Sequence, residues 1–466
     1  MNWIRIKILF SVQKADGAAG TPDDAYTVAA QVKDDALFGT FAEIDTAFWS
    51  ERMDRSLDTL SRFELGEAVD TTRGRYEFNL ELAADLFPPD LGGYNHLFGI
   101  LAGDLLRFVL PPLKVSDFVV KDIVFPDGWR DEHCKLFREY STSIPEIRKA
   151  LSIEDGMPLL AFSFKPRVGF KLDALEAIAN DVLAAGFNVV ELDTRFLPVN
   201  RAHLAQLREI AARIADKQWS GRSGRLSLNF TLPTPVLLEE IQAFCEQIPA
   251  PVVAKIDGGL NGIDSIQSVR RAKIIDQQGQ PPIITCYPLL RNALSNYVPP
   301  DKVLDALILS GADVIYPGGR PDIGHMKRSL DSSVQNSFVQ AVQRYRDLVQ
   351  RQEAMPTIAG GIYAGQLHAY YELLGPDVGW VLGGGVTLHR DGPKAGAELC
   401  VDVARAAAEL RQKAGRSWSA NLSKRLVTRC SEAYLGTSQL SNSELTYFSP
   451  SENLNIARLA PFEVKK

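Results

Sequence analysis

The sequence predicts an α/β protein in which a C-terminal (β/α)8 TIM barrel follows a smaller N-terminal α+β domain of the ferredoxin-like kind. From Pro158 onward, eight short apolar runs alternate with amphipathic stretches. Eight such units in about 250 residues are typical of the barrel. The chain has 466 residues, which leaves room for one further small domain.

Each apolar run is predicted to be a barrel strand. The runs lie at 159–164, 187–192, 226–230, 252–256, 283–286, 313–316, 356–359 and 379–382. Helical periodicity marks the stretches between them, such as 172–185, 202–217, 235–247 and 300–310. An open, doubly wound sheet is the rival architecture, but eight evenly spaced strands favour a closed barrel.

The first 150 residues have a different pattern. Strand-like segments lie at 3–8, 75–80 and 118–124, and helical stretches lie around 36–60 and 94–108. This pattern indicates a small sheet covered by helices on one face. We therefore expect an N-terminal domain at 1–150, a barrel at 151–416, and a tail at 417–466 that packs on the barrel or on a partner subunit.

Composition limits the classes of partner and compartment. The formal net charge is -6, whereas a nucleic-acid-binding face is usually basic. The five cysteines are scattered without C-x-x-C spacing, so we expect reduced thiols, a cytoplasmic protein and no zinc site. Apolar residues make up 45% of the chain, but no run approaches the ~18 needed to cross a membrane.

Two glycine-rich strand ends indicate a phosphate site. Barrel active sites lie at the carboxyl ends of the strands, and the loops after strands seven and eight often bind phosphate. Gly360 and Gly361 follow the seventh run, and Gly383 and Gly384 follow the eighth. Glycine lets backbone N–H groups approach an anion. The alternative is that these glycines only turn the chain.

Charged and polar residues follow the other strands. Lys165 could lose its proton in a desolvated mouth and act as a base, or it could be an ordinary surface lysine. Glu191 and Asp193 share one face of a strand, so they could bind Mg²⁺ or form ion pairs with Lys165 and Arg167. The remaining candidates at the strand ends are Asn229, Lys255, Tyr287 and Tyr316.

These motifs resemble the large chain of RuBisCO. The run 162–169 is similar to the first-strand motif of that family, in which two lysines flank a proline. Residues 85–104 resemble its N-terminal-domain motif, and 309–313, 359–361, 383–385 and 392–397 match in order along the barrel. Matches extend from about residue 75 to 407. The resemblance implies the predicted fold and a homodimer with shared active sites.

The departures from the family pattern concern carbon fixation. In RuBisCO the second strand ends in a carbamylated lysine and acidic residues that hold Mg²⁺, and Glu191 and Asp193 stand there in this chain. The histidine–arginine pair of the fifth strand is matched by Cys286 and Tyr287, and the histidine of the sixth by Tyr316. Arg167 replaces a lysine and cannot lose its proton. An asparagine supplied across the dimer interface is matched by Asp104.

This pattern is similar to the RuBisCO-like proteins, form IV of the family, which do not fix CO2. The resemblance implies an isomerase or lyase (decarboxylase) that forms an enolate on a monophosphorylated keto-sugar or sugar acid. Lys165 would be the general base, and the four glycines would bind phosphate with Asn229, Tyr287 and Tyr316 nearby. Arg167 and Lys255 would hold carboxylate or enolate oxygens. Glu191 and Asp193 would position the lysines or a Mg²⁺ ion.

Two alternatives remain open at this stage. The first is a sugar-phosphate-binding or regulatory protein without turnover, because many family residues are replaced. The second is a true ribulose-bisphosphate carboxylase, which the loss of the carbamylated lysine opposes.

Overall fold

The eight apolar runs form a closed parallel barrel in the computed structural model of the chain. Its strands are β5 (Leu160–Ser163), β6 (Val189–Leu192), β9 (Leu226–Asn229), β10 (Val253–Ile256), β11 (Ile283–Cys286), β12 (Val314–Ile315), β13 (Met355–Ala359) and β14 (Gly379–Leu382). Strands adjacent in sequence are adjacent in the barrel, and β14 pairs with β5 to close it. The predicted TIM barrel is therefore confirmed, and the open sheet is excluded.

The structure describes residues 2–38, 60–104, 113–165, 171–192, 200–219, 222–287, 297–318, 321, 332–414, 429–430 and 433. The chain divides into two compact units. The first comprises 1–139, 258–267 and 288–310, and the second comprises 140–257, 268–287 and 311–466. The boundaries at 150 and 416 and the role of the tail stay predictions. None of the helices in the described ranges combines the length and hydropathy that a bilayer-spanning helix requires.

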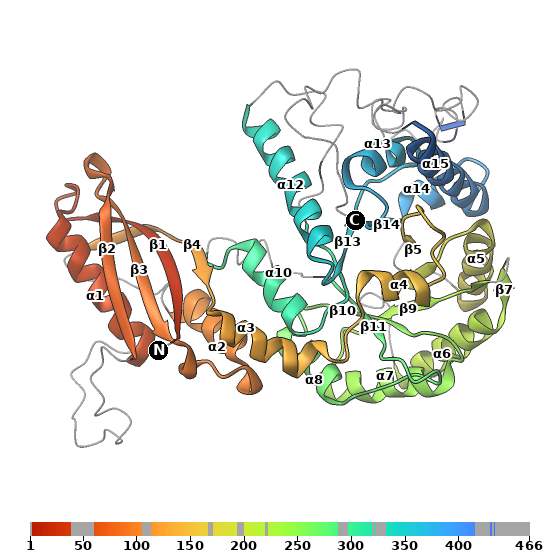
Figure 1. Cartoon of the computed structure of the whole chain (residues 1–466), viewed down its shortest axis with the longest axis horizontal. Helices are drawn as coiled ribbons and strands as arrows, with labels where there is room; N and C mark the ends of the chain where they lie inside the picture. Colours follow the sequence, from red (N-terminus) through yellow and green to blue (C-terminus); the bar gives the residue numbers. More distant parts are fainter. Residues whose placement is uncertain are drawn as a thin grey trace. The chain divides into compact units, whose positions relative to one another are not determined.

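A helix follows each barrel strand in the sequence, as predicted. These helices are α5 (Leu172–Ala185), α6 (Arg201–Asp216), α7 (Thr234–Gln247), α8 (Ile263–Arg271), α10 (Pro300–Leu309), α12 (Ser332–Arg351), α13 (Ala364–Leu374) and α15 (Pro393–Ala414). The shorter elements of this part are α4 (Ile144–Ala150), β7 (Gln218–Trp219), β8 (Arg222–Ser223) and α14 (Gly384–Thr387). Helices α5, α6 and α7 run along the outside of the strands (Figure 1).

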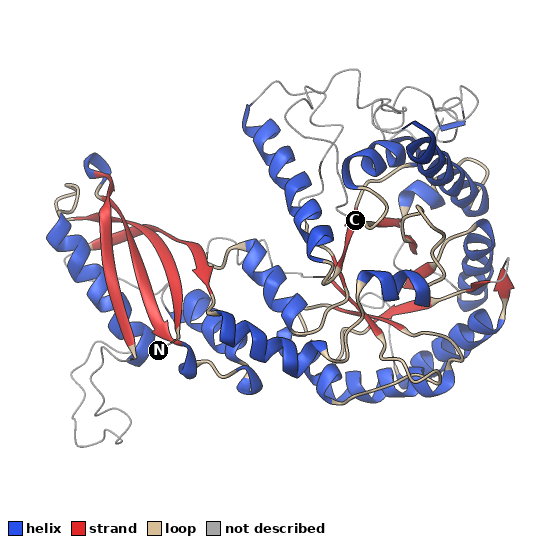
Figure 2. Cartoon of the chain, in the orientation of Figure 1, coloured by secondary structure: helices blue, strands red, loops and turns tan. Residues whose placement is uncertain are grey.

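The first unit contains a four-stranded antiparallel sheet in the order β2-β3-β1-β4. Its strands are β1 (Trp3–Gln13), β2 (Ser61–Asp70), β3 (Arg75–Ala83) and β4 (Lys114–Val124). Its helices are α1 (Pro22–Phe38), α2 (Gly93–Gly99) and α3 (Asp127–His133), with π-helical turns at Ile100–Asp104 and Cys134–Arg138 and 3-10 turns at Thr71–Arg73, Ala84–Leu86 and Pro89–Leu91. Figure 2 shows α1 lying along one face of the sheet. The predicted small α+β domain is confirmed.

Two details of this unit differ from the sequence prediction. Helix α1 begins at Pro22 and was not predicted over 22–35, while nearly all of the helical stretch expected around 36–60 lies outside the described residues. Strand β2 was not predicted. It is an edge strand in which only Ser61 is buried, so its sequence lacks the apolar alternation that identifies a strand.

A buried ion pair joins helix α8 to the amino end of strand β12. Arg270 on α8 and Asp313, just before β12, have side chains that are 1% and 0% exposed. Arg270 donates five hydrogen bonds, to the carbonyls of Tyr140, Pro282 and Gly311 and to the Asp313 carboxylate. The backbone N–H groups of Thr142 and Ile284 also donate to the Asp313 carboxylate. All five guanidinium donors are thus used within the fold.

Substituting Arg270→Met should destabilise the second unit by about 3–5 kcal/mol, because it leaves the Asp313 carboxylate buried without its cation. The measurement is urea-induced unfolding followed by circular dichroism. Arg405→Met is the control, since Arg405 forms an exposed pair with Glu154 that is worth at most about 1 kcal/mol. Equal losses in the two variants would contradict the structural role of Arg270.

Aromatic side chains form the core beside the sheet. The Trp129 and His133 rings are 4.0 Å apart, and Tyr94 packs edge-on against Trp129 at 4.8 Å. The indole N–H of Trp129 donates to the Phe87 carbonyl at 2.7 Å. His133 is fully buried, and this burial lowers its pKa from 6.5 to about 4. The histidine is therefore neutral in the folded unit at neutral pH.

The stability of the first unit should fall as the pH is lowered from 6.5 towards 4. In that window the unfolded chain protonates His133 and the folded unit does not, which costs about 3 kcal/mol in full. His133→Phe should flatten this part of the pH profile of thermal unfolding. The control is His96→Phe, which changes an exposed histidine on α2. A wild-type slope in His133→Phe would refute the assignment.

Candidate active site at the barrel mouth

Three buried side chains meet at the carboxyl ends of alternate strands of the barrel. Glu191 lies on β6, Lys255 on β10, and Tyr316 directly after β12. Alternate strands contribute side chains to the same layer of a (β/α)8 barrel. The three residues are 4%, 8% and 4% exposed, respectively. We call this group the mouth triad.

Hydrogen bonds join all three members of the mouth triad. Lys255 Nζ lies 2.8 Å from Glu191 Oε2 and 3.2 Å from the Tyr316 hydroxyl. The hydroxyl donates to Glu191, at 2.8 Å from Oε1 and 3.0 Å from Oε2. Because the phenol gives its single proton to the carboxylate, its oxygen is the acceptor for Lys255. Glu191 therefore faces two donors, one of them a cation.

Two aromatic rings surround the ammonium group. Lys255 Nζ lies 4.7 Å from the centroid of the Tyr316 ring and 5.8 Å from that of Tyr287. The rings themselves pack edge to face, with centroids 5.1 Å apart. The negative faces of aromatic rings attract a cation. The sequence placed all four of these residues at the mouth, and the structure brings them together.

The partner of Glu191 differs from the one expected. The sequence left open Mg²⁺ or ion pairs with Lys165 and Arg167, whereas the Glu191 carboxylate pairs with Lys255 on β10, which β9 separates from β6. The sequence could not reveal this pair, because 64 residues separate its members. Only barrel closure brings β6 and β10 to the same mouth.

The described part of the mouth does not fit Mg²⁺. A Mg²⁺ site needs oxygen ligands around an ion with no competing cation, but Lys255 already takes the place beside Glu191. A divalent ion about 4 Å from the ammonium would be repelled by about 8 kcal/mol at an effective dielectric of ~20. Among the described residues, no group of three or more His, Cys, Asp or Glu could hold a metal. Asp193, the other expected ligand, lies outside the described residues.

Lys165 follows β5 at the same end of the barrel. The backbone N–H of Phe164 donates to the Glu191 carbonyl at 3.1 Å, which ties the start of this loop to β6. Lys165 is half-buried, and its side chain passes Gly383. A Cβ at Gly383 would lie 3.0 Å from both Lys165 Cγ and the Ser163 carbonyl oxygen. Gly383 thus leaves the space that the lysine stem occupies.

The two glycine loops lie side by side at the mouth. Gly360 and Gly361 follow β13 with φ of +88° and +60°, a conformation that favours glycine. Gly385, in the turn after β14, lies so close to the first loop that a Cβ there would be 2.2 Å from the Ile362 carbonyl oxygen. This contact supports a shared role for the loops, and phosphate binding stays a prediction.

The remaining predicted residues fall into two groups. Asn229 is buried at the end of β9, next to Lys255 in the strand register, and accepts a hydrogen bond from the Thr231 hydroxyl at 3.2 Å. Arg167 lies outside the described residues, and only the backbone of Asp104 is described. Asn229 therefore lies at the carboxyl end of β9, and all three assignments stay predictions.

His389, after α14, is a loop histidine whose side chain is only 10% exposed. Burial lowers its pKa, and the backbone N–H of Asp391 donates to its Nδ1 at 3.1 Å. Nδ1 is therefore the acceptor nitrogen, and the neutral ring carries its proton on Nε2. No periodic pattern in the sequence indicates this burial, because the residue lies in a loop.

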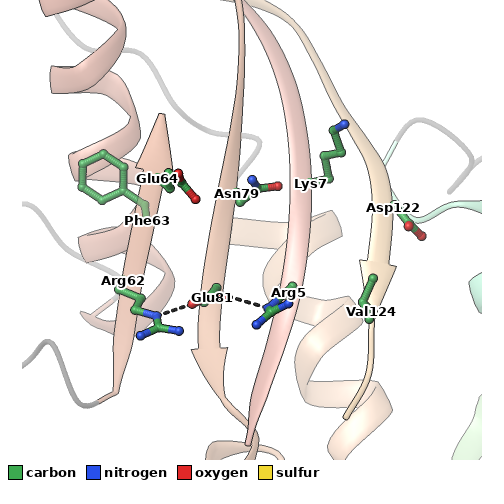
Figure 3. A pocket seen from close by; sticks show the side chains of 9 residues that line it. All are labelled: Arg5, Lys7, Arg62, Phe63, Glu64, Asn79, Glu81, Asp122 and Val124. Carbon is green, nitrogen blue, oxygen red and sulfur yellow. Dashed lines mark hydrogen bonds and ion pairs between the residues drawn. The ribbon is translucent and has the colours of Figure 1, made fainter. Parts of the chain in front are cut away.

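A depression of about 630 Å³ on the N-terminal sheet is a second candidate surface. Figure 3 shows Glu81 between Arg5 and Arg62, and both arginines bind its carboxylate. Three basic and three acidic residues line the depression: Arg5, Lys7, Arg62, Glu64, Glu81 and Asp122. Its charges compensate one another, so this surface does not select an anionic ligand, and the barrel mouth is the better candidate.

Comparisons with known proteins agree with the fold. Residues 304–428 match the family model for the ribulose bisphosphate carboxylase large chain, catalytic domain. The ribulose bisphosphate carboxylase of Thermococcus kodakarensis is 25% identical over 404 residues, covering 81% of this chain and 84% of that protein.

Two solved structures share the architecture. The octameric RuBisCO of Pyrococcus horikoshii has a TM-score of 0.65 at 19% identity, covering 87% of this chain and 90% of that one. A RuBisCO-like protein from Burkholderia fungorum has a TM-score of 0.60 at 17% identity, covering 90% and 96%. The fold is thus a (β/α)8 barrel of the RuBisCO architecture. The resemblance found in the motifs is confirmed: the chain is similar to the RuBisCO large chain.

Gly383→Ala should displace Lys165, because the added methyl would contact the lysine stem and the Ser163 carbonyl at 3.0 Å. We expect the labelling of Lys165 by pyridoxal 5′-phosphate and borohydride to slow by about tenfold or more, since misplacement of a reactive group by about 1 Å can cost 10²-fold. Peptide mass mapping measures this rate.

Gly99→Ala is the matched control, since no atom lies within 4 Å of its added Cβ. Unchanged labelling of Lys165 in Gly383→Ala would show that Gly383 does not set the position of the lysine.

Proposed function

We propose that this protein is a RuBisCO-like enzyme that does not fix CO2 and instead forms an enolate on a monophosphorylated keto-sugar or sugar acid. The reaction would be an enolisation, an isomerisation or a decarboxylation. One observation carries the proposal: Glu191, which stands where the family pattern has the carbamylated lysine, is bound by Lys255 and Tyr316. A glutamate has no amine on which a carbamate could form, and the Lys255 ammonium already lies where a metal bound to this carboxylate would need to be free of a competing cation.

Lys165 is the proposed general base. It is half-buried beside Gly383, and desolvation lowers the cost of removing a proton from an ammonium group. Such a group near a bound carbonyl can abstract the neighbouring C–H proton. Arg167 cannot do so because its guanidinium stays charged, and its proposed role is to hold an anionic oxygen with Lys255.

The proposed phosphate site lies at Gly360, Gly361, Gly383 and Gly384. The adjacent loops after β13 and β14 occupy the usual phosphate position of a (β/α)8 barrel. The rest of the substrate would lie against Asn229, Tyr287 and Tyr316. A substrate with one phosphate fits best, since aromatic rings stand where the family pattern places cationic groups for a second phosphate.

The proposed assembly is a homodimer in which Asp104 of one chain reaches the mouth of the other. The family resemblance supports this arrangement, and the related RuBisCO of Pyrococcus horikoshii is an octamer. We also propose that the protein is cytoplasmic. All five cysteines lie in the described ranges and none is in a disulfide, which agrees with a reducing compartment.

A binding or regulatory protein is the second candidate. The saturated Glu191 carboxylate favours it to some degree, because fully paired groups move protons poorly. Tight binding of a sugar phosphate without hydrogen exchange into that compound would support this candidate. Formation of a carboxylated product from ribulose bisphosphate and labelled CO2 would instead support a true carboxylase.

Lys165→Ala should lower the rate of solvent-deuterium incorporation next to the carbonyl of a substrate by about 10²–10⁴-fold, the usual contribution of a general base. The assay incubates a panel of monophosphorylated keto-sugars and sugar acids in D2O and follows exchange by NMR. Lys149→Ala is the control, because Lys149 is an exposed lysine on α4. Equal exchange rates in wild type and Lys165→Ala would remove Lys165 from this role.

A further inference from the structure

The mouth triad contains a cation, the Lys255 ammonium, at the position where a metal-dependent enolising site would hold its metal ion. Glu191 is the carboxylate nearest to Lys255, and its two oxygens receive the ammonium at 2.8 Å and the Tyr316 hydroxyl at 2.8 and 3.0 Å. A divalent ion bound to this carboxylate would lie close to the Lys255 ammonium and be repelled by it. The carboxylate is thus already neutralised by the chain itself.

The ammonium of Lys255 has donor capacity beyond the triad. An ammonium has three N–H groups, and Lys255 directs two of them to Glu191 and Tyr316. Among the residues that the structure describes, no acceptor is found for the third. The side chain is 10% exposed, so burial of Lys255 at the carboxyl end of β10 is not complete.

The position of this cation is fixed. Glu191 and Tyr316 hold Nζ from two strands, and the rings of Tyr287 and Tyr316 lie 5.8 and 4.7 Å from it. Preorganised donors stabilise a developing negative charge more effectively than mobile ones, because they need not reorient as the charge forms. A fixed ammonium can therefore serve where other barrels use a metal ion.

We infer that Lys255 is the resident cation of the mouth and takes the electrostatic place of a divalent metal, so that the site binds the anionic oxygens of its ligand without Mg²⁺. The Glu191 carboxylate positions this cation and does not ligate a metal. The inference deepens the proposed function, and it rests on that function only for the enolate nature of the ligand.

The first test measures Mn²⁺ binding to the full-length protein by electron paramagnetic resonance. Wild type and Glu191→Gln should bind Mn²⁺ equally weakly. Lys255→Met, which removes the charge and keeps the stem, should bind Mn²⁺ at least tenfold more tightly, and the added change Glu191→Gln should abolish that gain. Tight binding to wild type that Glu191→Gln removes would overturn the inference, as would a folded Lys255→Met protein without any gain.

The second test needs no metal and uses oxalate, a small dianion with paired oxygens like those of an enediolate. Oxalate should bind the wild type equally in EDTA and in Mg²⁺, as measured by calorimetry. Lys255→Met should lose at least tenfold in affinity, whereas Lys149→Met should not change. Lys255→Arg keeps the charge and serves if Lys255→Met does not fold, with partial retention of binding expected. Oxalate binding that requires Mg²⁺ would overturn the inference.

Neither test involves turnover, so they separate this inference from the proposed function. Deuterium exchange that EDTA abolishes would refute the role of Lys255 and leave the enolising activity in place. Oxalate binding that needs no metal, in a protein that catalyses no deuterium exchange, would support the role of Lys255 and refute the enolising activity.

Discussion

The ion pair between Glu191 and Lys255 is the constraint on which the barrel mouth depends. The two charged groups are buried on strands that are not neighbours. Their attraction offsets the free-energy cost of removing them from water only when they lie at hydrogen-bond distance. This requirement fixes the side chains of β6 and β10 and, through its hydroxyl, Tyr316. Tyr316 is held in turn by its backbone N–H, which donates to the Cys286 carbonyl at 3.1 Å. The geometry of the mouth triad therefore follows from the pairing of the barrel strands.

The barrel has a second buried ion pair, and the contrast between the two separates stability from function. Arg270 and Asp313 lie at the amino ends of the strands, and all five donors of the arginine bind groups of the fold. Lys255 lies at the carboxyl ends, where barrel active sites occur, and part of its donor capacity faces the mouth. All donors of Arg270 bind groups of the fold, as a residue that stabilises the barrel requires. Lys255 has described acceptors for two of its three N–H groups, as a residue that binds a ligand requires.

The sequence predicted the barrel well because its strands are continuous apolar runs separated by amphipathic helices. Strand β11 was predicted at its observed bounds, and β14 likewise, since both are completely buried. It failed where this pattern is absent: the edge strand β2 exposes most of its side chains, and the helix that begins at Pro22 was not predicted. For the site, strand-end position predicted that Glu191, Lys255, Tyr287 and Tyr316 lie at one mouth. It could not predict which charge pairs with which, because that depends on distances across the barrel.

The distribution of charge over the mouth argues for a ligand that is anionic at one end and bears a carbonyl or carboxylate at the other. The glycine loops after β13 and β14 offer backbone rather than side chains, as a phosphate site requires, and Lys165 passes directly beside Gly383. On the other side, Glu191 and Lys255 cancel in net charge, and the rings of Tyr287 and Tyr316 carry none. Among the described residues on that side, a second phosphate dianion would face the remaining donor capacity of one ammonium, far less than its charge needs. A single developing negative charge on an enolate oxygen matches that donor. Under the proposed function, the replacements that oppose carboxylation of a bisphosphate therefore suit a smaller substrate.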